Sequence, residues 1–140
     1  MPNNAEIREA YATLIHDNSP WGFYTTVTYR IQRRDPLRAA DRLWDVLENK
    51  FDAERAFVAA EYHKYGGVHL HALSCHSERP DLNPTSMWKY LHKAFGRTTV
   101  EVPRYSSTAL VSWYCSKYVT KGDCDFQFYG DPCTWITGKT

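Results

Sequence analysis

Apolar residues recur along this chain with two periods, one typical of helices and one typical of strands. At helical spacing, apolar side chains fall on one side of four segments. Several of these segments follow a residue that commonly caps a helix: Asn3 or Asn4, Asp35, and Asn83. A proline after Asp35 and after Asn83 suits the first helical turn. The sequence therefore predicts helices over residues 5–16, 36 to about 50, 84–95 and about 107–122.

Strands are expected where β-branched and aromatic residues alternate with polar ones, over residues 22–30, 55–63, 68–76, 98–103 and 125–129. The second and third of these are joined by residues 64–67, whose length and glycine content suit a hairpin, so these two strands should be antiparallel. Helices distributed among strands in this order predict an α+β fold, with a five-stranded antiparallel sheet and flanking helices. At 140 residues, the chain is expected to form a single domain over residues 1–140.

The composition is that of a folded intracellular protein. Hydrophobic residues make up 43% and charged residues 24%, which excludes a disordered or fibrous chain. No apolar run approaches the roughly 20 residues that span a bilayer, and the polar start is unlike a signal peptide, so neither export nor membrane insertion is expected. The four cysteines form no CxxC pair, which argues against a zinc knuckle and a disulfide framework and favours a reducing compartment.

The net charge of +1 limits the kind of nucleic-acid contact that the chain can make. A protein that depends on non-specific affinity for duplex DNA is usually far more basic, so any such contact must be local. The basic groups within residues 30–38 and 89–97 are interpreted as solvated surface.

A pair of histidines in the third predicted strand is the first stretch that suggests chemistry. Alternate side chains of a strand share a face, so His69 and His71 should project together, about 7 Å apart. The hairpin places Glu61 within about one residue of the position opposite His69. Two imidazoles and a carboxylate form a candidate site for Mg²⁺ or Mn²⁺, and Zn²⁺ is also compatible. His63 shares the parity of Glu61 and is an alternative ligand or a hydrogen-bond partner of a ligand, although its place beside the turn favours a solvent-facing role. His76 has the opposite parity to His71 and is not expected to be a ligand.

The last predicted helix carries a second candidate constellation. Tyr114 and Tyr118 are four residues apart and each has a lysine three residues on, Lys117 and Lys121, so all four can line one broad side of the helix. A tyrosine that attacks phosphorus forms a 5′-phosphotyrosyl ester and releases a 3′-hydroxyl, and a nearby cation helps both phenolate and phosphate. Because the ordinary tyrosine pKa is about 10, such a nucleophile needs activation. Half-buried structural tyrosines are the alternative interpretation.

Together and in this order, the two constellations resemble those of the HUH endonucleases, specifically the rolling-circle replication initiator (Rep) proteins of single-stranded DNA viruses and plasmids. Residues 23–29 are similar to the first family motif, a threonine-rich apolar strand. His69-Leu70-His71 is similar to the second, with Glu61 at the spacing of a third metal ligand, and the third motif, Tyr-x-x-Lys, is matched twice. The resemblance covers about residues 22–130 and implies the HUH fold with its RRM-like palm.

This resemblance implies a metal-dependent, site-specific single-stranded DNA endonuclease that nicks and rejoins DNA through a covalent 5′-phosphotyrosine intermediate and initiates rolling-circle DNA replication. The metal, Mg²⁺ or Mn²⁺ held by Glu61, His69 and His71, would polarise the scissile phosphate. Tyr118 with Lys121 is similar to the single-tyrosine pattern of circular eukaryotic DNA viruses, and the run 114–121 to the two-tyrosine microvirus initiators. Tyr118 is the expected nucleophile in both cases.

The partners implied by the resemblance are single-stranded DNA at an origin hairpin and helicase or other replication proteins of the host. The protein would act where DNA is replicated, in the host nucleus for a eukaryotic virus or in the cytoplasm for a phage or plasmid. Residues expected to contact DNA lie in the first strand and the nearby loops: Tyr24, Tyr29, Arg30, Arg33, Arg34 and His63.

Two other functions are compatible with the same residues. A single-tyrosine HUH transposase shares the chemistry but should be an obligate dimer with its tyrosine acting in trans. A non-catalytic module could instead stack single-stranded bases on Tyr24, Tyr29 and Tyr62. The end of the chain, Gly138-Lys139-Thr140, is similar to the end of a phosphate-binding P-loop, but Cys133 stands where that motif needs glycine, so no ATPase activity is predicted.

Overall fold

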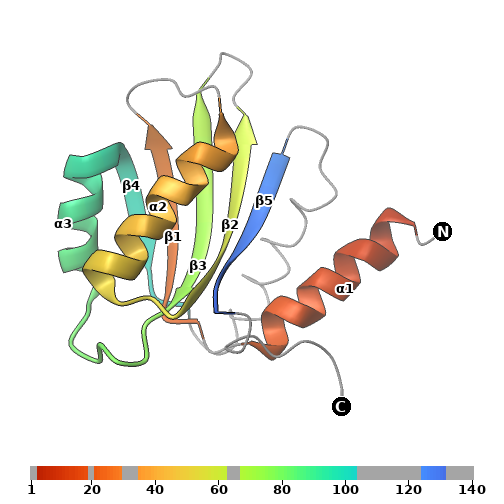
Figure 1. The fold of residues 1–140 in the computed structure, drawn as a ribbon, viewed down its shortest axis with the longest axis horizontal. Coiled ribbons are helices and arrows are strands. Elements are labelled where there is room, and N and C mark those ends of the chain that lie inside the picture. Colours follow the sequence, from red (N-terminus) through yellow and green to blue (C-terminus); the bar gives the residue numbers. More distant parts are fainter. Residues whose placement is uncertain (1–2, 19–20, 30–34, 63–66, 104–123, 132–140) are drawn as a thin grey trace.

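The computed structural model describes residues 3–18, 21–29, 35–62, 67–103 and 124–131 (Figure 1). Within these ranges the elements follow the order predicted from the sequence. They are α1 (Asn4–Asp17), β1 (Phe23–Tyr29), α2 (Pro36–Phe51), β2 (Arg55–Tyr62), β3 (Val68–Cys75), α3 (Pro84–Phe95), β4 (Gly96–Glu101) and β5 (Cys124–Gly130). The predicted helix over about residues 107–122 lies outside the described residues.

The helix starts follow from their capping residues. At the start of α1, the side chain of Asn3 accepts a hydrogen bond from the backbone N–H of Glu6. At the start of α2, Asp35 accepts from the backbone N–H of Arg38, and at the start of α3, Asn83 accepts from that of Ser86. The prediction for β4, over residues 98–103, was wrong by two residues at each end. Gly96 ends α3 with a φ of 123°, a conformation that glycine adopts without strain, and so turns the chain directly into the strand.

The five strands form one sheet of order β4-β1-β3-β2-β5, and each neighbouring pair is antiparallel. This confirms the predicted α+β class with a five-stranded antiparallel sheet, and it confirms that β2 and β3 pair as a hairpin. The positions of β4 at one edge, beside β1, and of β5 at the other, beside β2, were not predicted. Both edge strands pair with strands distant in the sequence.

Helices cover the two faces of the sheet to different extents. Helix α2 crosses the face that is nearer the viewer in Figure 1, and its Leu43 and Leu47 are buried together with Leu91 of α3 and apolar side chains of the strands. On the opposite face, Ile15 at the end of α1 and Trp21 are buried against side chains of β2, β3 and β5. The second core is smaller than the first, and part of its sheet face carries polar side chains instead.

Two of the four cysteines lie in the described part of the chain. Cys75 and Cys124 are free thiols, whereas Cys115 and Cys133 lie outside the described residues. No helix in the described part of the chain is long and apolar enough to cross a membrane.

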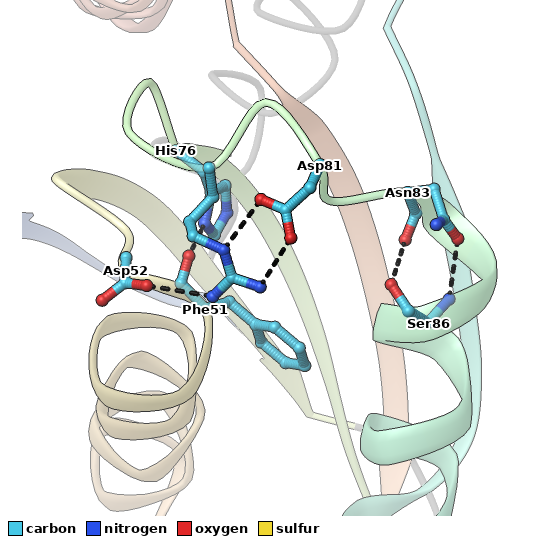
Figure 2. Close-up of polar contacts among 7 residues, drawn as sticks. Phe51, Asp52, His76, Asp81, Asn83 and Ser86 are labelled. Atoms are coloured by element: carbon cyan, nitrogen blue, oxygen red, sulfur yellow. Dashed lines mark hydrogen bonds and ion pairs between the residues drawn. The ribbon is translucent and has the colours of Figure 1, made fainter.

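The segment that follows β3 is held to the end of α2 by a buried histidine and an arginine, as Figure 2 shows. The Nδ1–H of His76 donates to the carbonyl oxygen of Phe51 at 2.7 Å (Figure 2). Its Nε2 accepts from the hydroxyl of Ser74, also at 2.7 Å. Close by, the Arg79 guanidinium bonds the carboxylates of Asp52 and Asp81. His76 therefore has a structural role at the end of the sheet.

Because of His76, the free energy of unfolding should decrease at acidic pH. Burial lowers the pKa of His76 below its ordinary value of 6.5, so the unfolded chain takes up this proton at a higher pH than the folded chain does. The stability that the neutral ring provides is complete above about pH 6.5 and is lost as the pH falls from there toward the lowered pKa of the folded state. Urea unfolding measured across this pH range should show that the free energy of unfolding falls as the pH falls. The change of this free energy with pH should be smaller in His76→Gln. Equal dependence of the free energy of unfolding on pH in His76→Gln and the wild type would contradict the assignment.

Candidate active site

One line of polar side chains crosses the sheet on the face opposite α2 and α3. The register pairs Arg97 of β4 with Thr28 of β1, and Thr28 with His69 of β3. It then pairs His69 with Glu61 of β2, and Glu61 with Cys124 of β5. Directly opposed residues of antiparallel strands point to the same face, with Cβ atoms about 5 Å apart. We call these five residues the polar row, and each strand of the sheet contributes one of them.

His71 lies in the next row, beside the apolar core of this face. Its register partners are Thr26 on β1 and Ala59 on β2, and its residue exposure is only 6%. The predicted sharing of one face by His69 and His71 is therefore confirmed. Glu61 lies directly opposite His69, within the one-residue margin expected from the hairpin.

Both ring nitrogens of His71 have partners. Its Nε2 lies 3.3 Å from Oε1 of Glu61, and its Nδ1 lies 3.2 Å from the hydroxyl of Tyr24, whose ring stacks nearly parallel to the imidazole. If Tyr24 donates to Nδ1, the neutral ring carries its proton on Nε2 and donates to Glu61. In the other tautomer, Nδ1–H donates to the oxygen of Tyr24, which leaves the Nε2 lone pair directed toward Glu61. The second tautomer is the one that can bind a metal through Nε2.

His69 has a different neighbour. Its Nε2 lies 3.5 Å from the Thr28 hydroxyl, and its ring centroid is 6.2 Å from that of His71. Among the described residues, no three histidine, cysteine or acidic side chains already form a group that could hold a metal ion. The donor set itself suits a divalent cation, because it combines two imidazoles with a carboxylate on adjoining strands.

Tyr24 should support metal binding by orienting His71. The Tyr24→Phe substitution removes the hydroxyl that accepts from Nδ1–H in the metal-binding tautomer, and loss of such a partner typically weakens metal affinity about 10- to 100-fold. Titration with Mn²⁺ in a calorimeter should show this loss, whereas Tyr90→Phe on α3 should bind as the wild type does. Equal affinities in all three proteins would contradict this role.

Two of the tyrosines expected to form the alternative stacking module lie on opposite faces of the sheet. Tyr24 lies on the candidate-site face and contacts His71, whereas Tyr62 has the parity of Ala60 and so belongs to the face that α2 and α3 cover. A stacking platform that uses both tyrosines is therefore not possible within one sheet face. The remaining predicted residues lie outside the described ranges: the side chain of Tyr29, and Arg30, Arg33, Arg34, His63, Tyr114, Lys117, Tyr118 and Lys121.

Sequence reasoning missed the residues that surround His69 on its β1 and β4 side. A cavity of about 440 Å³ is lined there by Thr26, Thr28, His69, Arg97, Thr98 and Thr99. The interpretation of Arg97 as solvated surface, together with basic residues of α3, agrees with its exposure, but it did not place Arg97 beside this cavity. Alternation of Arg97, Thr99 and Glu101 along β4 was the available signal for a polar face. The pairing of that face with β1 could not be deduced from the local sequence. Cys124, which the register places beside Glu61, was missed for the same reason.

No protein-family model matches this chain, and no curated protein or solved structure matches it at a significant level. A function must therefore be inferred from the residues of the site and their geometry.

Proposed function

We propose that this chain is an HUH endonuclease of the Rep class, which nicks and rejoins single-stranded DNA to initiate rolling-circle replication. The observation that supports this most is the arrangement of Glu61, His69 and His71 on one face of a five-stranded antiparallel sheet. Glu61 lies directly opposite His69 and 3.3 Å from Nε2 of His71. The HUH resemblance implies these three residues as ligands, and in this proposal the sheet is the RRM-like palm of that fold.

The three ligands would hold Mg²⁺ or Mn²⁺. When bound, such an ion supplies Lewis-acid polarisation of the scissile phosphate. The chain's own contribution is to set the orientation of the ligands: the Tyr24 hydroxyl fixes the His71 ring, and Thr28 gives His69 a hydrogen-bond partner while it is not a ligand.

Tyr118 is the proposed nucleophile. Its phenolic oxygen, after losing its proton, forms a bond to phosphorus while the bond from phosphorus to the 3′-oxygen breaks. The departing 3′-oxygen takes up a proton, and the 5′ end stays linked to the tyrosine. Lys121 would stabilise the phenolate and the phosphate by its charge, with Lys117 in the same role if Tyr114 attacks. Because a phosphodiester is replaced by another phosphodiester, the reverse reaction rejoins strands.

Chain connectivity is compatible with this role for Tyr118. It precedes Cys124 by six residues, and Cys124 is the register partner of Glu61. Six residues of fully extended chain span at most about 21 Å. Tyr118 is therefore tethered to the strand that flanks the ligand carboxylate.

The proposed substrate is single-stranded DNA at an origin hairpin, acted on where replication proteins of the host assemble. A net charge of +1 gives little general attraction for duplex, which favours an exposed single strand. A purely stacking module is less well supported, because Tyr24 and Tyr62 lie on opposite faces of the sheet.

Capture of a covalent adduct tests the proposal with no origin sequence specified in advance. The protein is incubated with Mn²⁺ and a pool of circular single-stranded DNA that carries randomised hairpin loops. Adducts that survive denaturing detergent are purified, and the DNA linked through its 5′ end is sequenced. We expect one enriched sequence, no adduct with chelator, and none with a fully paired linear version of that sequence. Binding of the pool without any adduct in Mn²⁺ would instead identify a non-catalytic module, and an obligate dimer with in-trans cleavage would identify a transposase.

A further inference from the structure

The cavity beside His69 has the size and place of a ligand subsite. Its volume of about 440 Å³ lies within the range of roughly 300–1,000 Å³ that small-molecule sites occupy. It lies on the sheet face over the paired strands β1 and β4, where Arg97 and Thr99 are exposed to solvent, at the opposite end of the polar row from Cys124. His69, a proposed metal ligand, forms one of its walls, so anything bound in the cavity lies next to the candidate metal site.

The lining of this cavity favours an anion. Arg97 is the one lining residue with a permanent charge, none of the lining residues is acidic, and among the described residues its guanidinium forms no ion pair. The cross-strand pair Thr26 and Thr99 adds two hydroxyl groups on the same face. An arginine and hydroxyl donors are the groups that commonly bind phosphate oxygens of nucleic acids.

The separation between Arg97 and His69 suits the binding of a nucleotide that adjoins the reacting phosphate. Arg97 and His69 are separated by β1, and two strand spacings amount to about 10 Å. An arginine side chain together with one nucleotide can bridge this span. A free phosphate ion in the cavity would satisfy Arg97 but would leave most of the volume unfilled.

We propose that this cavity binds the nucleotide next to the scissile phosphate of the single-stranded substrate, with Arg97 contacting that nucleotide's own phosphate and Thr26 and Thr99 donating hydrogen bonds to it. This inference rests on the proposed function and extends it, because it states where the strand leaves the metal site: across β1, toward the β4 edge of the sheet.

Binding without metal separates this subsite from catalysis. Fluorescence anisotropy of a labelled oligothymidylate is measured in chelator over a salt series for the wild type, Arg97→Gln, Arg97→Lys and Arg38→Gln. The last is a matched control, since Arg38 is an exposed residue of α2, which covers the opposite face. We expect Arg97→Gln to bind about tenfold more weakly and to lower the slope of log K against log salt by about 0.7. The affinity of Arg97→Lys should lie between those of the wild type and Arg97→Gln, and the affinity of Arg38→Gln should equal that of the wild type.

A neutral phosphate in the DNA then tests the contact itself. With the sequence found by adduct capture, a methylphosphonate replaces each phosphate beside the nick in turn. One such position should weaken binding by the wild type and should cause no further loss in Arg97→Gln, because the contact is already absent. Equal losses in both proteins would overturn the assignment of Arg97. Competition by inorganic phosphate as strong as that by oligonucleotide would show an anion site without a nucleotide role.

These outcomes distinguish the subsite from the function on which it rests. If the wild type neither binds single strands nor forms an adduct, the proposed function fails. If the wild type does both and Arg97→Gln behaves as Arg38→Gln does, the subsite is wrong and the endonuclease proposal stands.

Discussion

Tyr118→Phe is expected to eliminate the covalent protein–DNA adduct and to lower nicking at least about 10³-fold. Phenylalanine keeps the ring and removes only the hydroxyl whose oxygen bonds to phosphorus, so the fold should remain. Adduct is quantified on a denaturing gel with Mn²⁺ and labelled single-stranded origin DNA. Tyr90→Phe, on α3 and away from the candidate site, is the matched control and should form adduct at the wild-type rate.

Peptide mapping of the adduct decides between the two tyrosines of the repeated motif. A single adduct on Tyr118 supports the single-tyrosine pattern. Adducts on both Tyr114 and Tyr118 indicate a two-tyrosine mechanism, in which the second residue attacks after the first has been used. Residues four apart on a helix lie about one turn, or 5.4 Å, apart along its axis, so a single bound phosphate can be in line with only one of the two tyrosines. An adduct on Tyr114 alone would therefore show that the assignment of the nucleophile is wrong.

His71→Ala and Glu61→Gln are each expected to weaken Mn²⁺ binding by more than about tenfold and to abolish nicking. Each change removes one of three protein ligands, and Glu61→Gln does so with almost no change in shape. Calorimetric titration with Mn²⁺ measures the binding directly, without reference to activity. His92→Ala on α3 is the control for loss of an imidazole away from the site.

The metal prediction also separates metal binding from DNA binding. Chelator should stop nicking by the wild type, while binding of single-stranded DNA persists, because phosphate and stacking contacts do not require the ion. Mn²⁺ affinity that is unchanged in His71→Ala would rule out the proposed ligand set. If a variant loses both Mn²⁺ binding and its thermal unfolding transition, the substituted residue has a structural role. Glu61→Gln is the milder change and is included because it should bind Mn²⁺ weakly while the fold remains.

Local sequence determined the parts of the site that depend on short-range geometry. A strand alternates its side chains with a period of two, so His69 and His71 had to share a face once β3 was recognised. A short hairpin sets the register of its two strands, and this brought Glu61 opposite His69. The capping residues Asn3, Asp35 and Asn83 set the helix starts in the same way, since each acts on backbone groups only a few residues away.

Tertiary structure alone decided what surrounds those ligands. Tyr24 meets His71, and Arg97 joins the row of His69, because β1 pairs with both β3 and β4 in a particular register. These pairings join residues tens of positions apart, and they depend on which faces of the sheet bury their apolar side chains against α1, α2 and α3. Periodicity shows that a strand has a polar face but not which strand lies beside it. For this reason the sequence predicted that Arg97 is exposed, as it is, but only the fold placed it beside His69 at the edge of a cavity.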